Sequence, residues 1–96
     1  MKEKKFKKKI GNYEIVVTYR NNNIAVVIPR AVYCTALGKN FRVEKRGSRF
    51  KITAQVFCLP EILDLIEEAA QVAASLDEYR DLWVRKMMKT RGFEEA

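Results

Sequence analysis

Cationic side chains alternate with apolar ones from Phe41 to Phe57, and this spacing could serve in binding a polyanion. The stretch reads F-R-V-E-K-R-G-S-R-F-K-I-T-A-Q-V-F, which predicts a β-hairpin turning at residues 46–48. Successive side chains of a strand point to opposite faces, so one face can seal a core while the other presents cations, hydroxyls and a ring. The outward face is predicted to carry Arg42, Glu44, Arg49, Lys51, Thr53, Gln55 and Phe57. It is either a nucleic-acid surface or a solvated hairpin face.

Residues suited to catalysis are scarce, so we predict that the protein is not an enzyme and has no catalytic residues, metal or cofactor. The chain contains no histidine, which removes the usual base of a hydrolytic triad. Its four glycines form no phosphate-binding loop. Asp77, Glu78 and Asp81 lie within one helical turn and offer an alternative, a metal-dependent nuclease, although acids in a first helical turn commonly interact with the helix dipole. Cys34 and Cys58 are expected to be buried thiols, with a disulfide as the alternative.

The charges are segregated along the chain. Residues 1–51 hold 14 Lys or Arg and 3 acids, a net charge of +11, whereas residues 52–96 hold 5 Lys or Arg and 9 acids, a net charge of −4. A concentrated positive field attracts polyanions. No run of apolar residues is long enough for a membrane span or a secretory signal, which predicts a cytoplasmic protein.

The periodicity predicts a single α+β domain over residues 1–96, with an antiparallel sheet of about five strands in the basic region 1–58. Strands are expected at 6–10, 13–20 and 24–28, joined by turns at Gly11-Asn12 and Asn21–Asn23. The third strand is apolar on both faces and should be central. After Pro29, a short helix ending at Gly38 is expected to bury Tyr33, Ala36 and Leu37, with an extended segment as the alternative.

From Pro60 to about Arg91 the apolar period becomes helical, which predicts a long C-terminal helix, or a helix pair with a break at the capping box Ser75–Glu78. This helical tail, residues 60–91, is expected to cover one face of the sheet. It also carries an alanine-rich stripe that favours pairing with a second copy, as a homodimer or higher homo-oligomer. The predicted interface residues are Ile66, Ala69, Ala73, Leu76 and Trp83.

Applying the alternation to every strand gathers the cations on the sheet face away from the helices. Apolar and aromatic groups lie between them, an arrangement that suits single strands, because cations follow the phosphates while flat groups receive unstacked bases. We therefore predict a DNA- or RNA-binding protein for single strands, with little sequence specificity. The predicted nucleic-acid-binding residues are Lys7, Lys9, Arg20, Arg42, Arg46, Arg49, Lys51 and Phe57. Tyr19, Tyr33 and Phe41 are further rings, expected in the core. A protein–protein assembly or regulatory adaptor, of viral or plasmid type, is the alternative function.

In the order of its features the chain resembles the archaeal single-stranded DNA-binding proteins of the ThermoDBP type and their relatives. That order is K-F-K-K-K-I-G-N-Y-E-I-V-V, then R-V-E-K-R-G-S-R-F-K-I, then the helical tail from Pro60. PC4-like and Whirly-like binders share the same outline of strands followed by a helix. The resemblance implies a basic, aromatic sheet surface for single strands and oligomers formed through helices. It assigns no individual site residues.

Overall fold

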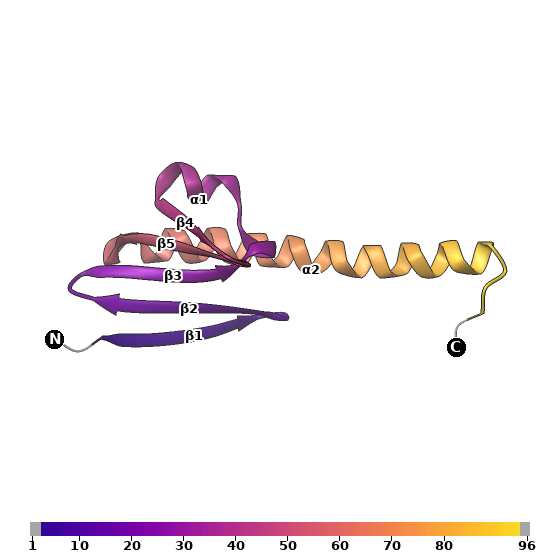
Figure 1. The fold of residues 1–96 in the computed structure, drawn as a ribbon, viewed down its shortest axis with the longest axis horizontal. Coiled ribbons are helices and arrows are strands. Elements are labelled where there is room, and N and C mark those ends of the chain that lie inside the picture. The colour runs from indigo at the N-terminus through magenta and orange to yellow at the C-terminus, as the bar shows by residue number, and fades with distance from the viewer. Residues whose placement is uncertain (1–2, 95–96) are drawn as a thin grey trace.

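Five antiparallel strands form a single sheet, and the long helix α2 runs behind it (Figure 1). The computed structural model describes residues 3–94, except for the side chains at positions 77–83. The strands are β1 (Lys4–Ile10), β2 (Tyr13–Arg20), β3 (Asn23–Pro29), β4 (Arg42–Arg46) and β5 (Arg49–Gln55), in the spatial order β1-β2-β3-β5-β4. The central place predicted for the third strand, the α+β class and the five-stranded antiparallel sheet are confirmed.

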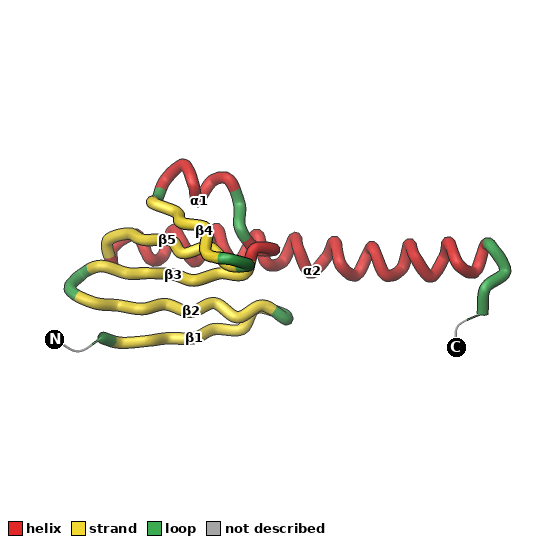
Figure 2. Tube along the Cα trace, viewed as in Figure 1, coloured by secondary structure: helices red, strands yellow, loops and turns green. Residues whose placement is uncertain are grey.

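The hairpin turns lie where glycine and asparagine occur in the sequence. Asn21 and Asn22 both have positive φ, 52° and 63°, a conformation that asparagine tolerates better than most residues and that joins β2 to β3 tightly. Gly47 has a φ of 61° in the β4–β5 turn. The predicted turns at Gly11-Asn12, Asn21–Asn23 and residues 46–48 are therefore confirmed within a residue or two. Figure 2 shows how short these connections are.

The sheet buries one face against α2 (Leu59–Thr90) and leaves the other face open. Cross-strand pairs such as Val17↔Val26 and Val26↔Ile52 show that every second residue of each strand points to the covered side. Ile62, Ile66 and Ala70 of α2 meet this side at successive helical turns. The fully buried residues are Ile15, Val17, Ile24, Val26, Ile28, Val32, Leu37, Ile52, Ile62, Ile66 and Ala70. Lys8 also lies on the covered side, where its ammonium pairs with the carboxylate of Glu67.

The connection between β3 and β4 differs from the single helix that we expected after Pro29. A 3₁₀ turn, η1 (Arg30–Val32), is followed by two extended residues, and α1 (Thr35–Asn40) begins only at Thr35. Gly38 therefore lies inside α1 and is not its C-terminal cap. The physical reason is that Val32 and Leu37 are both fully buried, and the chain must extend between them for each side chain to reach the core.

The helix α2 is about twice as long as the sheet that it covers. Its 32 residues span about 48 Å at 1.5 Å per residue, whereas strands of seven or eight residues span about 25 Å. The C-terminal half consequently projects past the sheet (Figure 1). The helix begins with Pro60 in its first turn and ends before Gly92, whose φ is 82°. The capping box expected at Ser75–Glu78 depends on a Glu78 side chain that lies outside the described residues.

Both cysteines, Cys34 and Cys58, are free thiols and half-buried, so the predicted thiol form is the one present. Among the described residues, no helix is long and apolar enough to cross a bilayer.

Candidate nucleic-acid interface

The open face of the sheet is built by the strand register. Lys7, Val16, Val27, Lys51 and Glu44 are successive neighbours across all five strands. The same parity defines the whole surface, which we call the open face. It comprises Lys5, Lys7, Lys9, Glu14, Val16, Thr18, Arg20, Asn23, Ala25, Val27, Pro29, Arg42, Glu44, Arg46, Arg49, Lys51, Thr53 and Gln55.

The centre of the open face is concave because its residues are small. Thr18, Ala25 and Thr53 are cross-strand neighbours, and each is only half-buried. Two adjoining depressions, of about 420 Å³ and 280 Å³, lie over this centre, and Glu3, Thr18, Ala25 and Lys51 line both. Val27 lines the larger one. The floor is therefore apolar or hydroxylated, and longer side chains surround it.

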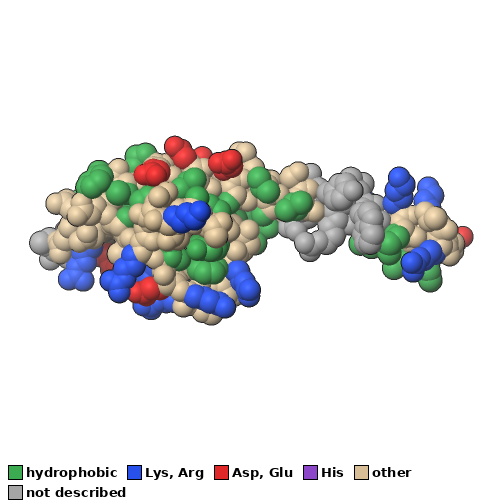
Figure 3. All heavy atoms as spheres, turned by 90° about the horizontal axis from the view of Figure 1, so that it is seen from above, with side chains coloured by type: hydrophobic (Ala, Val, Ile, Leu, Met, Phe, Trp, Pro, Cys, Tyr) green, Lys and Arg blue, Asp and Glu red, His purple; other side chains and the backbone are tan. Residues whose placement is uncertain are grey.

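Cations flank this floor on two sides. Lys5, Lys7 and Lys9 of β1 form one border, and the Arg and Lys residues of β4 and β5 form the other. Eight strand residues of the open face are Lys or Arg, and two, Glu14 and Glu44, are acidic. Figure 3 shows the result on the surface, with Lys and Arg side chains gathered along one side of the domain, a few acids among them, and further acids along the opposite side.

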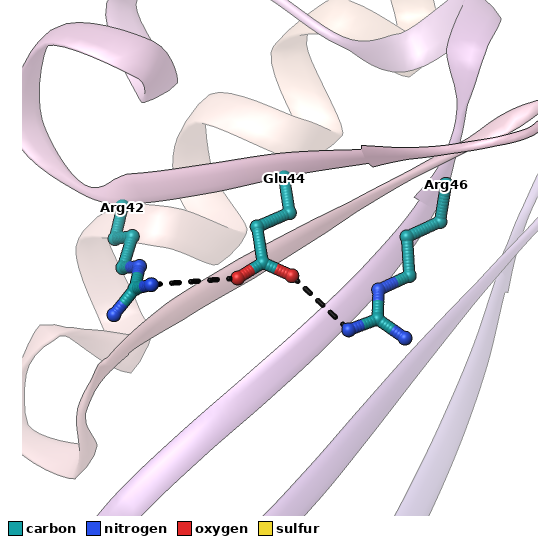
Figure 4. Close-up of polar contacts among 3 residues, drawn as sticks. All are labelled: Arg42, Glu44 and Arg46. Atoms are coloured by element: carbon teal, nitrogen blue, oxygen red, sulfur yellow. Dashed lines mark hydrogen bonds and ion pairs between the residues drawn. The ribbon is translucent and has the colours of Figure 1, made fainter.

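The guanidinium groups of Arg42 and Arg46 are bridged by Glu44 (Figure 4). Arg46 Nη2 donates to Glu44 Oε2 over 3.1 Å, and Arg42 Nη2 lies 3.7 Å from Oε1. The hydrogen bond and charge of Arg46, followed by the charges of Arg42 and Lys51, lower the pKa of the Glu44 carboxyl. Glu44 therefore remains ionised and holds two of the eight cations.

The remaining cations are less constrained. Lys7 lies 4.0 Å from Glu14, at the limit of an ion pair between exposed groups. Arg20, Arg49 and Lys51 have no ion-pair partner within the described part of the chain. These cations are available to an external anion.

The register places seven of the eight predicted binding residues together on the open face: Lys7, Lys9, Arg20, Arg42, Arg46, Arg49 and Lys51. Phe57 is the exception. The strand β5 ends at Gln55, and the backbone N–H of Val56 donates to the carbonyl of Asn22 as the chain enters the 3₁₀ turn η2 (Val56–Cys58). Strand alternation does not extend to Phe57, whose side chain is 75% exposed beyond the sheet.

Aromatic rings are absent from the open face as the register of the described strands defines it. Tyr19, Tyr33 and Phe41 pack against the core on the covered side, as expected. The bridging role of Glu44 was not foreseen, although the alternation already placed this residue between Arg42 and Arg46. The apolar side chains that the open face offers in place of rings are consequently aliphatic: Val16, Ala25 and Val27.

The residues predicted for an oligomer interface are divided between two environments. Ile66 is fully buried in the chain's own core, so its assignment to an interface with another copy is wrong. Ala69 and Ala73 are half-buried, and Leu76 is 58% exposed. The side chains of Trp83 and of the candidate metal ligands Asp77, Glu78 and Asp81 lie outside the described residues. Among the side chains that are described, no cluster of carboxylates or thiols is arranged to hold a metal ion.

Comparisons with protein-family models, with curated proteins and with solved structures find no significant match to this chain.

Proposed function

We propose that the open face binds single-stranded DNA or RNA with little sequence specificity. One observation carries the proposal: cations from β1 and from β4–β5 border a concave floor of apolar and hydroxylated residues on a sheet face that α2 leaves uncovered. Solubility alone would scatter the charges over the surface, whereas here eight Lys or Arg side chains gather on one face of the sheet, and Glu61, Asp64, Glu67 and Glu68 lie on α2 behind the other face.

The spacing of the two cationic borders suits a single nucleic-acid strand. Neighbouring strands lie about 4.8 Å apart, so β1 and β5 are separated by about 14 Å across the floor. Lysine and arginine on each side can follow a phosphate backbone that runs along the direction of β3. Phosphates are the same in every sequence, which accounts for the low specificity.

Bases would lie against the half-buried side chains of the floor. Val16, Ala25 and Val27 are exposed enough to be touched, and an unstacked base buries apolar area there. Thr18 and Thr53 offer hydroxyl groups at the same depth. These contacts replace the aromatic stacking that the sequence suggested, and they predict weaker binding per base than a ring would give.

A duplex suits the surface less well than a single strand. Helices are the usual readers of the major groove, and α2 lies behind the sheet while α1 is only six residues long. Unpaired bases can reach the floor, but bases stacked inside a duplex cannot.

A titration with fluorescent oligonucleotides tests the proposal. Oligo-dT, oligo-U and a duplex of equal length are compared at about 50 and 200 mM salt, where log affinity should fall by roughly 0.7 per log unit of salt for each phosphate contacted. Binding of single strands with this salt slope is expected. No detectable binding at the lower salt would overturn the proposal, and so would a preference for the duplex. Cleavage of the oligonucleotide only after Mg²⁺ is added would favour the nuclease alternative.

A further inference from the structure

An apolar groove runs beside the first half of α2, away from the open face. Its walls are α2 on one side and the segment Ala31–Ala36 on the other, and it encloses about 410 Å³. Leu65, Ala69, Val72 and Leu76 line the helical wall, and Glu68 lies at the rim. Val72 and Leu76 are 55% and 58% exposed, so the groove is an apolar surface that this chain does not cover.

The four apolar residues of the helical wall follow a coiled-coil spacing. Leu65, Ala69, Val72 and Leu76 are separated by four, three and four residues, the alternation that keeps a seam on one side of a helix. We call these four residues the seam. Ile62, Ile66 and Ala70, which are spaced by four and point into the core, occupy a different side of the same helix. Leu65 and Ala69 also pack against the edge of the core, whereas Val72 and Leu76 are exposed, so the second half of the seam is the part that this chain leaves uncovered.

The projecting half of α2 supplies matching groups. Met87 follows Leu76 by eleven residues, close to three full turns, so it returns to the side of the seam and is half-buried. Val84 and Met88 nearby are 40% and 46% exposed. Lys86 and Lys89 are exposed beside them. The spacing of the seam continues to positions 79 and 83, whose side chains lie outside the described residues.

The charges of α2 differ between its two ends. Glu61, Asp64, Glu67 and Glu68 occupy the first three turns, and Lys86 and Lys89 lie near the end. A straight helix cannot bring its own two ends together, but two copies running in opposite directions can. Parallel pairing would instead place the acidic ends side by side, where they repel.

We propose that the groove is filled by the projecting half of α2 from a second copy of this chain, in an antiparallel, twofold arrangement. Pairing the two helices about a twofold axis near position 78 places Met87 of one copy opposite Ala69 of the other. Glu68 of each copy then faces Lys86 and Lys89 of the other. Each chain contributes a groove and fills the groove of its partner, so both grooves are occupied in a dimer and no further copy is added.

Sedimentation equilibrium tests the pairing, and the unaltered chain should have the mass of a dimer at micromolar concentration. Leu76→Glu places a charge in the seam and should raise the dimer dissociation constant more than about tenfold. Gln71→Glu is the matched control, since this exposed residue lies on another side of the helix and its substitution should leave the mass unchanged. Equal thermal midpoints of the dilute variants show that both fold. A monomeric mass of the unaltered chain up to millimolar concentration overturns the proposal.

Charge exchange and cross-linking test the orientation. Glu68→Lys and Lys89→Glu should each weaken the dimer about threefold, and the double variant should recover it. With Cys34 and Cys58 replaced by alanine, the double variant Ala69→Cys/Met87→Cys should form disulfide-linked dimers, because these positions face each other only in the antiparallel pair. Ala69→Cys alone should not cross-link. Cross-linking of that single variant, or failure of the double one, contradicts the proposed register. Affinity for a short oligonucleotide should be the same in all dimerisation variants, which keeps this proposal separable from the proposed function.

Discussion

The ring of Tyr33 stacks on the ring of Phe50, with centroids 4.1 Å apart and planes inclined by 13°. Tyr33 precedes α1 and Phe50 lies on the covered side of β5, so the pair joins the irregular connection to the sheet. The hydroxyl oxygen of Tyr33 lies so close to the Cα of Gly38 that a Cβ there would overlap it. Glycine at position 38 is thus explained by a neighbouring ring and not by helix termination.

Gly38→Ala should destabilise the protein even though alanine is the better helix former. The helical gain is about 1 kcal/mol, whereas the added methyl group would displace the Tyr33 ring from its stack on Phe50 at a cost of about 1–3 kcal/mol, so the free energy of unfolding should fall. Chemical denaturation measures the change.

Tyr33→Phe provides the control for this crowding. Only the hydroxyl oxygen overlaps the added methyl group, because the ring carbon that bears it would lie at an ordinary contact distance of 3.6 Å. Gly38→Ala should therefore be neutral or stabilising in the Tyr33→Phe background. An equal loss of stability in both backgrounds would show that the ring is not the cause.

The sheet could be predicted from the sequence because three independent local signals agree. Alternation assigned the faces, Gly11 and Asn21–Asn23 marked the turns, and the doubly apolar segment 24–28 indicated the central strand. The connection after Pro29 could not be predicted, since its shape depends on the burial of Val32 and Leu37 by elements distant in sequence. Tertiary packing there overrides local propensity.

Lys51→Glu should weaken oligonucleotide binding much more than Lys45→Glu. Lys51 borders both depressions of the open face, whereas Lys45 is opposite Phe50 and lies on the other side of the sheet. Both substitutions change the net charge equally. We expect a loss of about tenfold or more for Lys51→Glu, together with a shallower salt dependence, in a fluorescence anisotropy titration.

Equal losses for the two lysine variants would indicate attraction by net charge alone and would remove the open face as the site. Adding Arg42→Glu to Lys51→Glu should abolish binding while the thermal midpoint changes little, since both residues are exposed or half-buried and lie outside the core.

The positions of the candidate site residues could be predicted within the β-strands, where the register determines the face of each side chain, but not past the ends of the strands. Seven cations were placed by alternation, which holds for as long as the strand continues. Phe57 was placed wrongly on the strand face, because β5 ends two residues earlier at a backbone hydrogen bond between Val56 and Asn22. The nucleic-acid function itself stays a prediction until binding is measured.

Glu44→Gln should strengthen oligonucleotide binding. The ionised carboxylate now holds the guanidinium groups of Arg42 and Arg46, and a phosphate must compete with it for both. Its replacement by the neutral amide releases them, so affinity should rise severalfold and the salt slope should steepen by up to about two phosphate contacts. Glu14→Gln, which changes the charge equally on the same face but frees only Lys7, should have a smaller effect. Unchanged affinity in Glu44→Gln would place these arginines outside the binding surface.

The contribution of Glu44 to stability should depend on pH in a defined direction. Because its pKa is lowered in the folded chain, the contribution is complete above the usual glutamate pKa and disappears as the pH falls through the lowered value. The difference in unfolding free energy between the unaltered chain and Glu44→Gln should therefore be constant near neutral pH and shrink only in acid. Denaturation at a series of pH values measures it. A difference already lost above the usual glutamate range would contradict the lowered pKa.

Ile66→Ala distinguishes an intramolecular core residue from an interface residue. Ile66 has no exposed surface and packs between α2 and the covered side of the sheet, so truncation should remove about 2–5 kcal/mol from the free energy of unfolding. The loss should be the same at low and high protein concentration, because the cavity forms within one chain. Leu76→Ala is the matched comparison on the exposed seam: it should cost little in dilute solution, and its cost should grow with concentration as dimers form. Denaturation at two concentrations about a hundredfold apart separates the two behaviours. A concentration-dependent cost for Ile66→Ala would instead return that residue to the oligomer interface.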